Sequence, residues 1–143
     1  MPLLKSNYKI LKEHNLIVEY HSGDLDLESY INFVKGTTLD PQFSLNMNYL
    51  IDISNVVVTA SIDDIRKYNN FTEDNFKTDR KRRVAFITNS PNQMVFSTLF
   101  KGSNTQKLKE IEIFSTTNAA IEWLDSNLNK NEILDVLASL MLS

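Results

Sequence analysis

Tyr49-Leu50-Ile51-Asp52-Ile53-Ser54 is the stretch around which the rest of the chain is arranged. Its residues are mostly apolar, and the run 55–61 behind it leads to a helix start. A short apolar run of this kind is typical of an interior strand of a parallel sheet. Asp52 is the only charge in the strand. Because an unpaired buried carboxylate is costly, we expect this side chain to lie near the strand's end, within reach of solvent or donors, or to have a shifted pKa.

The segments on either side predict an α/β order. Residues 8–12 and 16–21 read as two strands joined by a short polar turn, so the opening pair is expected to be an antiparallel hairpin. A helix capped by Asp26 should follow and end near Gly36. Further strands are expected at 83–88 and 111–114, and further helices after Ser61, Ser90 and Thr116 or Thr117. This alternation predicts a mostly parallel sheet with right-handed crossovers.

The C-terminal segment is more apolar than a one-sided surface helix requires. Residues 132–142 are expected to form a helix with seven large apolar side chains among them. We therefore predict an α/β domain over residues 1–128 and an amphipathic helix over 129–143 that packs on the domain or on a partner. The second apolar side of that helix predicts a homodimer.

Composition indicates an ordinary globular chain. The 143 residues are 42% hydrophobic and 23% charged, and the net charge is −3, which offers no overall attraction to nucleic acid or to an acidic membrane surface. The chain has no cysteine, so disulfides, thiolate metal sites and cysteine nucleophiles are excluded. No apolar run is long enough for membrane insertion. We expect a cytoplasmic protein.

Motifs of catalysis and cofactor binding are absent from the sequence. There is no Walker loop, no dinucleotide glycine fingerprint and no serine-hydrolase or zinc-protease motif. His14 and His21 have no metal-ligand spacing and are expected on the surface. The basic run 80–83 is expected to be a solvated helix end, because no aromatic or glycine is interleaved in it. The sequence thus predicts no enzyme, no cofactor and no metal.

One weak candidate site remains at the carboxyl ends of the strands. Ligands of open parallel sheets tend to bind there, and the predicted ends carry Asp52, Ser54, Thr88 and Ser90, with Ser61 at the next helix start. A crevice for a small acidic or lipid-like ligand is one interpretation. The alternative is that these side chains only cap helices and turns. Asp52 as a general acid or base would need a partner that its own strand does not supply.

Several motifs together resemble the SpoIIAA-like family, which is related to the STAS domains. They are the opening hairpin, Gly23-Asp24-Leu25-Asp26-Leu27-Glu28, Asp40-Pro41-Gln42-Phe43, Leu50-Ile51-Asp52-Ile53, Arg83-Val84-Ala85-Phe86, and Phe114 followed by Ala120-Ile121-Glu122-Trp123-Leu124. The likeness covers roughly residues 8–128. It implies a βα superhelix, and the uncharacterised branch that this chain most resembles has no established activity.

The resemblance also bears on Ser61. STAS antagonists have a regulatory serine after the central strand, and the match through Asp52-Ile53-Ser54-Asn55-Val56 aligns it with Ser61. Ala60 replaces the acid before that serine, however, and Asp63 replaces a glycine. Ser61 can serve as an N-cap, and a phosphate there would also lie favourably at a helix N-terminus.

The leading functional hypothesis from the sequence is a non-enzymatic binding or regulatory domain that acts through protein–protein interaction. The alternative is a carrier of a small apolar or lipid-like ligand in a pocket between sheet and helices. The eight phenylalanines leave room for such a pocket.

Overall fold

A computed structural model describes residues 2–75, 80–102 and 108–143, and in them five strands form one sheet in the order β1-β2-β3-β4-β5. The first pair is antiparallel and the other three pairs are parallel. The strands are β1 (Lys5–Leu11), β2 (Leu16–Leu25), β3 (Asn48–Val58), β4 (Arg82–Ile87) and β5 (Lys109–Phe114). The predicted mixed α/β class and the antiparallel edge strand are confirmed.

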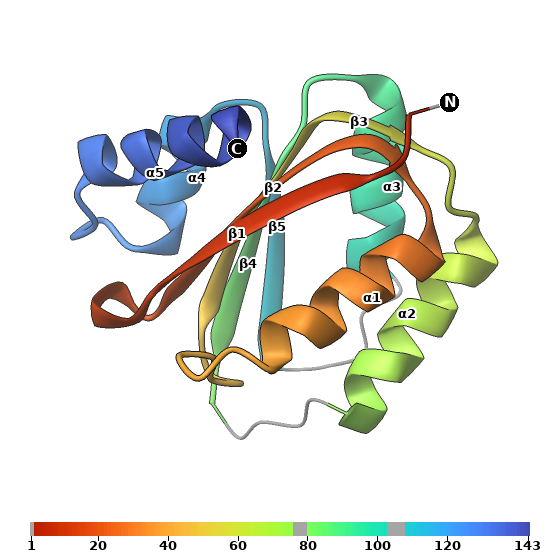
Figure 1. The fold of residues 1–143 in the computed structure, drawn as a ribbon, viewed down its shortest axis with the longest axis horizontal. Helices are drawn as coiled ribbons and strands as arrows, with labels where there is room; N and C mark the ends of the chain where they lie inside the picture. The colour runs from red at the N-terminus through yellow and green to blue at the C-terminus, as the bar shows by residue number, and fades with distance from the viewer. Residues whose placement is uncertain (1, 76–79, 103–107) are drawn as a thin grey trace.

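Helices cover both faces of the sheet (Figure 1). One face packs against α1 (Leu27–Thr38), α2 (Ile62–Asn75) and α3 (Pro91–Gly102). The other face packs against α4 (Thr117–Leu124) and α5 (Lys130–Leu142). Because side chains alternate along a strand, apolar residues of the strands lie on both faces of the sheet and join the clusters beneath the helices. The molecule is therefore a three-layer structure with its sheet in the middle.

The stretch from Tyr49 to Ser54 lies in β3, the central strand. Leu50, Ile51 and Ile53 are buried, with Leu50 packed toward α4 and α5 and the two isoleucines packed toward α1, α2 and α3. A strand that is covered on both faces needs a nearly continuous apolar run, which is what this stretch supplies. The predicted interior strand is confirmed, although it extends further, to Val58.

The ends of α1 show one confirmed expectation and one error. Asp26 caps the helix by accepting a hydrogen bond from the Ser29 backbone N–H, as predicted. The helix does not stop at Gly36 but continues to Thr38. The hydroxyl groups of Thr37 and Thr38 donate to the carbonyl oxygens of Val34 and Lys35, so the last turn stays helical without a left-handed glycine.

The C-terminal helix α5 begins at Lys130, with Asn129 accepting a hydrogen bond from the Glu132 backbone N–H. Its buried residues join the cluster formed by β2 and α4, and they are Ile133, Val136, Leu137 and Leu140. Asn7 of β1 also donates to the Leu140 carbonyl oxygen. One side of α5 therefore completes the hydrophobic cover of the sheet.

Candidate functional site

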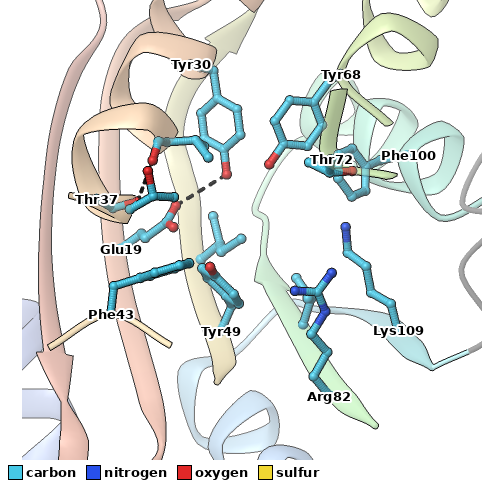
Figure 2. Close-up of a pocket in the computed structure, with 14 residues that line it drawn as sticks. Glu19, Tyr30, Thr37, Phe43, Tyr49, Tyr68, Thr72, Arg82, Phe100 and Lys109 are labelled. Atoms are coloured by element: carbon cyan, nitrogen blue, oxygen red, sulfur yellow. Dashed lines mark hydrogen bonds between the residues drawn. The ribbon is translucent and has the colours of Figure 1, made fainter. Parts of the chain in front are cut away.

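A pocket lies between the sheet and helices α1 and α2 (Figure 2). About 40 Å³ of it is open to the centres of water molecules, which is room for a few waters or a small ligand. We call it the polar pocket. Its polar and aromatic lining residues are Glu19, Tyr30, Thr37, Thr38, Phe43, Tyr49, Tyr68, Thr72, Arg82, Phe100 and Lys109.

Strand alternation places the charged groups on one face of the sheet. Glu19 of β2 pairs in register with Ile51, and Arg82 of β4 pairs with Lys109 of β5. Glu19, Arg82 and Lys109 are 1%, 5% and 9% exposed. Tyr49, Arg82 and Lys109 lie at or next to the first residues of their strands, so the pocket opens over the amino ends of the parallel strands.

The acidic side of the polar pocket is a hydrogen-bonded group around Glu19. Its carboxylate lies 2.8 Å from Nε2 of His21 and 3.3 Å from the hydroxyl of Tyr30, which donates to it. His21 is fully buried, and its Nδ1 lies 2.6 Å from Oγ of Ser6. A buried carboxylate needs such donors, because its ionised form is otherwise strongly disfavoured away from water.

The basic side is formed by Arg82 and Lys109, which are neighbours across β4 and β5. Nη1 of Arg82 donates to the Leu45 carbonyl oxygen at 3.2 Å. Nζ of Lys109 lies 5.1 Å from the centre of the Phe100 ring. Two cations side by side away from water disfavour each other's charged form. This wall is therefore suited to a group with negative charge.

Burial governs the ionisation of the basic pair. Burial lowers the pKa of Lys109 to about 7, with desolvation as the largest cause and the nearby charge of Arg82 as the second. The charge of Glu73 raises this pKa and so acts in the opposite direction. Desolvation also lowers the pKa of Arg82, against the effect of Tyr49 and Tyr68. Lys109 can thus be a neutral amine or a cation near neutral pH.

Three tyrosines complete the lining, and all three stay neutral. Burial raises the pKa of Tyr30, Tyr49 and Tyr68, and the charge of Glu19 raises each of them further. The rings of Tyr30 and Tyr68 lie 5.2 Å apart. A neutral phenol donates a hydrogen bond, so the pocket offers donors as well as charges.

The residues predicted to form a crevice at the carboxyl ends of the strands cap turns and helices. The carboxylate of Asp52 accepts from the backbone N–H and hydroxyl of Ser54, at 2.9 and 2.6 Å. Ser61 accepts from the backbone N–H of Asp64, whose carboxylate accepts from the backbone N–H of Ser61. These contacts are the capping alternative that the sequence also allowed. A ligand crevice there stays a prediction.

Thr88 and Ser90 lie at the same end of the sheet. Thr88 is buried, and its backbone N–H donates to the Phe114 carbonyl oxygen. Ser90 accepts from the backbone N–H of Gln93. The buried amide of Gln93 in turn donates to the carbonyl oxygens of Ser54 and Val56. Polar groups at the carboxyl end of β3 are thereby satisfied by α3 itself.

Two surface predictions were wrong. His21 is fully buried and bonded to Glu19, because it lies two residues along β2 on the same face of the sheet. The basic run 80–83 is not wholly solvated: Arg82 lines the polar pocket, while Arg83 stacks on Trp123 at 5.2 Å. The alternation of side chains along β4 could have predicted that Arg82 is buried. Val84 and Phe86 lie on the same face of the strand as Arg82, and both are apolar and buried.

A possible metal site lies at the other end of the sheet from α3, where the β1–β2 turn meets α5. Glu13, His14 and Glu132 bring potential ligand atoms within 4.8 Å of one another. Nε2 of His14 lies 3.1 Å from a carboxylate oxygen of Glu132. Sequence spacing did not predict this group, because Glu132 is more than a hundred residues from the adjacent Glu13 and His14.

None of the described helices combines the length and apolar character that crossing a membrane requires.

No family model matches the chain, and no curated protein matches it by sequence. Among solved structures, the chain is similar to an uncharacterised protein of the DUF3478 family from Shewanella loihica PV-4 that has a SpoIIAA-like fold. The TM-score is 0.56 at 18% identity, over 87% of this chain and 95% of that one. The chain therefore has the SpoIIAA-like fold that its sequence motifs predicted.

Proposed function

We propose that this chain is a non-enzymatic binding domain that holds a small molecule with an acidic group in the polar pocket. The observation that supports the proposal is the pair of buried, neighbouring cations, Arg82 and Lys109, on the pocket wall. Buried charges of like sign are costly to place side by side, and a bound carboxylate would offset that cost. The hydroxyl groups of Tyr49 and Tyr68 supply further donors to such a ligand.

The size and charge of the pocket favour this ligand over the apolar or lipid-like one. The 40 Å³ open to water centres suits a molecule of a few heavy atoms, whereas pockets for drug-sized ligands span several hundred Å³. The wall also carries three buried ionisable side chains, Glu19, Arg82 and Lys109, and charged groups of this kind favour a polar ligand over an alkyl chain. Native mass spectrometry of freshly purified protein separates the two ligands by mass.

Binding of a simple carboxylate tests the proposal. We expect lactate to shift the backbone amide resonances around Tyr49, Arg82 and Lys109 in a titration followed by NMR. Lactamide, which has the same shape but no charge, should not. Arg82→Gln should weaken lactate binding at least tenfold, because a buried charge-assisted hydrogen bond is worth about 1.5–3 kcal/mol.

The matched control is Arg66→Gln. Arg66 is exposed on α2 and is paired only at the surface with Asp63, so its loss should leave the titration unchanged. Equal weakening by Arg66→Gln and Arg82→Gln, or shifts spread over the whole surface, would show non-specific binding and contradict the proposal.

Our second proposal is a regulatory role through protein–protein interaction. The partner that we propose is a second copy of this chain, so that the protein is a homodimer. This proposal is favoured by apolar side chains on α5 that remain exposed although the helix packs on the sheet. Leu134 is 37% exposed and Met141 is 52% exposed, and the two lie seven residues apart on one side of the helix. An exposed apolar stripe is a common feature of interfaces.

Light scattering tests the homodimer. The wild-type chain is expected to have the mass of a dimer at micromolar concentration, and the double variant Leu134→Glu with Met141→Glu the mass of a monomer. These substitutions are preferable to deletion of 131–143, which would remove the buried residues of α5 and expose the hydrophobic cluster that they cover. Leu39→Glu, at an exposed position after α1, is the control. A monomeric wild-type chain would remove this proposal.

A further inference from the structure

Lys109 has the surroundings of a reactive amine. It extends from the first residue of β5 into the polar pocket, where Figure 2 shows its ammonium end beside the Arg82 guanidinium. Its side chain is buried against the ring of Phe100. Lysines become nucleophilic when they are desolvated or lie next to another cation, because both effects favour the neutral amine.

Both effects act on Lys109 together. Burial and the charge of Arg82 lower its pKa to about 7, so a large fraction of the amine is neutral at physiological pH. An exposed lysine, by contrast, is almost entirely protonated there. Lys109 also lines the cavity of the polar pocket, so a reactant has room near the amine.

The rest of the pocket selects the reactant. Arg82 presents a planar guanidinium, which matches a carboxylate in two parallel hydrogen bonds. Because Arg82 and Lys109 are register partners, a carboxylate on Arg82 places its neighbouring carbon near the Lys109 amine. The hydroxyl groups of Tyr49 and Tyr68 point into the same space in Figure 2 and are O–H donors for a carbonyl oxygen.

We propose that Lys109 captures a small 2-oxo acid as a reversible imine, with Arg82 holding its carboxylate. The inference rests on the proposed function, because it assumes that an acidic ligand enters the polar pocket. The amine lone pair forms a bond to the carbonyl carbon and gives a carbinolamine. The carbonyl oxygen then leaves as water, with the two hydrogens that the neutral amine carried. No electrons are transferred, and hydrolysis restores both partners.

Reductive trapping with pyruvate tests the imine. Wild-type protein is incubated with pyruvate and cyanoborohydride, and the adduct is located by peptide mass spectrometry. We expect one adduct per chain, at Lys109, with the mass of pyruvic acid less one oxygen. Exposed lysines such as Lys67 serve as internal controls, and their labelling should be at least tenfold lower. The yield at Lys109 should rise with pH through about 7, as its amine loses its proton.

Lactate binding by the wild-type chain separates this inference from the proposed function, because lactate has no keto group and cannot form an imine. Lys109→Arg cannot form an imine either, so pyruvate trapping at this position should be lost in that variant. Lactate binding without an adduct at Lys109 of the wild-type chain would overturn the imine and leave the acidic-ligand site standing. If neither lactate binding nor an adduct is observed in the wild-type chain, both proposals fail. Equal labelling of Lys109 and Lys67 would also overturn the inference.

Discussion

Replacement of Glu19 by alanine should lower the free energy of unfolding by about 3–5 kcal/mol, the range measured when one member of a buried charged or hydrogen-bonded group is removed. Glu19 is 1% exposed and is the acceptor for both His21 and Tyr30. Without the carboxylate these two donors would remain buried with no acceptor in its place. Urea unfolding followed by circular dichroism measures the loss.

Two further variants show whether the loss comes from the buried contacts. Glu19→Gln keeps the size and one acceptor oxygen, so it should destabilise less than Glu19→Ala. Glu112→Ala removes a half-exposed carboxylate that pairs with Lys101, and its effect should be within about 1 kcal/mol. If Glu19→Ala were as mild as Glu112→Ala, the hydrogen-bonded group around Glu19 would contribute little to stability.

The second large effect is expected at Lys109, as a dependence of stability on pH. Burial lowers its pKa from 10.5 to about 7, so between these values the unfolded chain holds a proton that the folded chain has released. The free energy of unfolding therefore rises with pH over this window, and the contribution of Lys109 should grow by about 2–3 kcal/mol between pH 6 and pH 9.

Lys109→Met removes this titration while keeping a side chain of similar length. At pH 6 the variant should have the higher free energy of unfolding, and its advantage over the wild-type chain should shrink toward pH 9. Comparison of the two proteins cancels the titration of all other groups, including the tyrosines of the pocket. Lys67→Met, at an exposed position of α2, is the control and should show no such slope. A constant difference for Lys109→Met would show that the amine is not desolvated.

The two predictions describe a site in which the buried Lys109 lowers the stability of the folded chain and the hydrogen-bonded Glu19 raises it. Buried side chains that cost stability are often found at functional sites. Arg82 and Lys109 are two buried basic side chains next to each other, a costly arrangement, whereas Glu19 accepts hydrogen bonds within the protein. For that reason the ligand is proposed to bind at the cationic wall.

Much of the fold was predictable because its signals are local. The apolar run in β3, the Asp26 cap and the reciprocal cap of Ser61 and Asp64 each depend on residues a few positions apart. The end of α1 was not predictable from Gly36, because the hydroxyl groups of Thr37 and Thr38 keep the last turn helical.

The polar pocket was not predictable in the same way. Glu19, Arg82 and Lys109 are far apart in the sequence, and each is charged, so each alone resembles a surface residue. Their spatial relation depends on which strands are neighbours and on the register between them, such as Arg82 opposite Lys109. That register is a property of the assembled sheet.

The sequence by itself determined the order of strands and helices, the central position of the stretch from Tyr49 to Ser54, and the caps that begin the helices, because each follows from propensity and periodicity within one segment. Only the tertiary structure decided that His21 is buried and that an acid and two bases from three strands face one cavity. The physical reason is that burial and ionisation depend on what packs against a side chain, and those neighbours come from elsewhere in the chain.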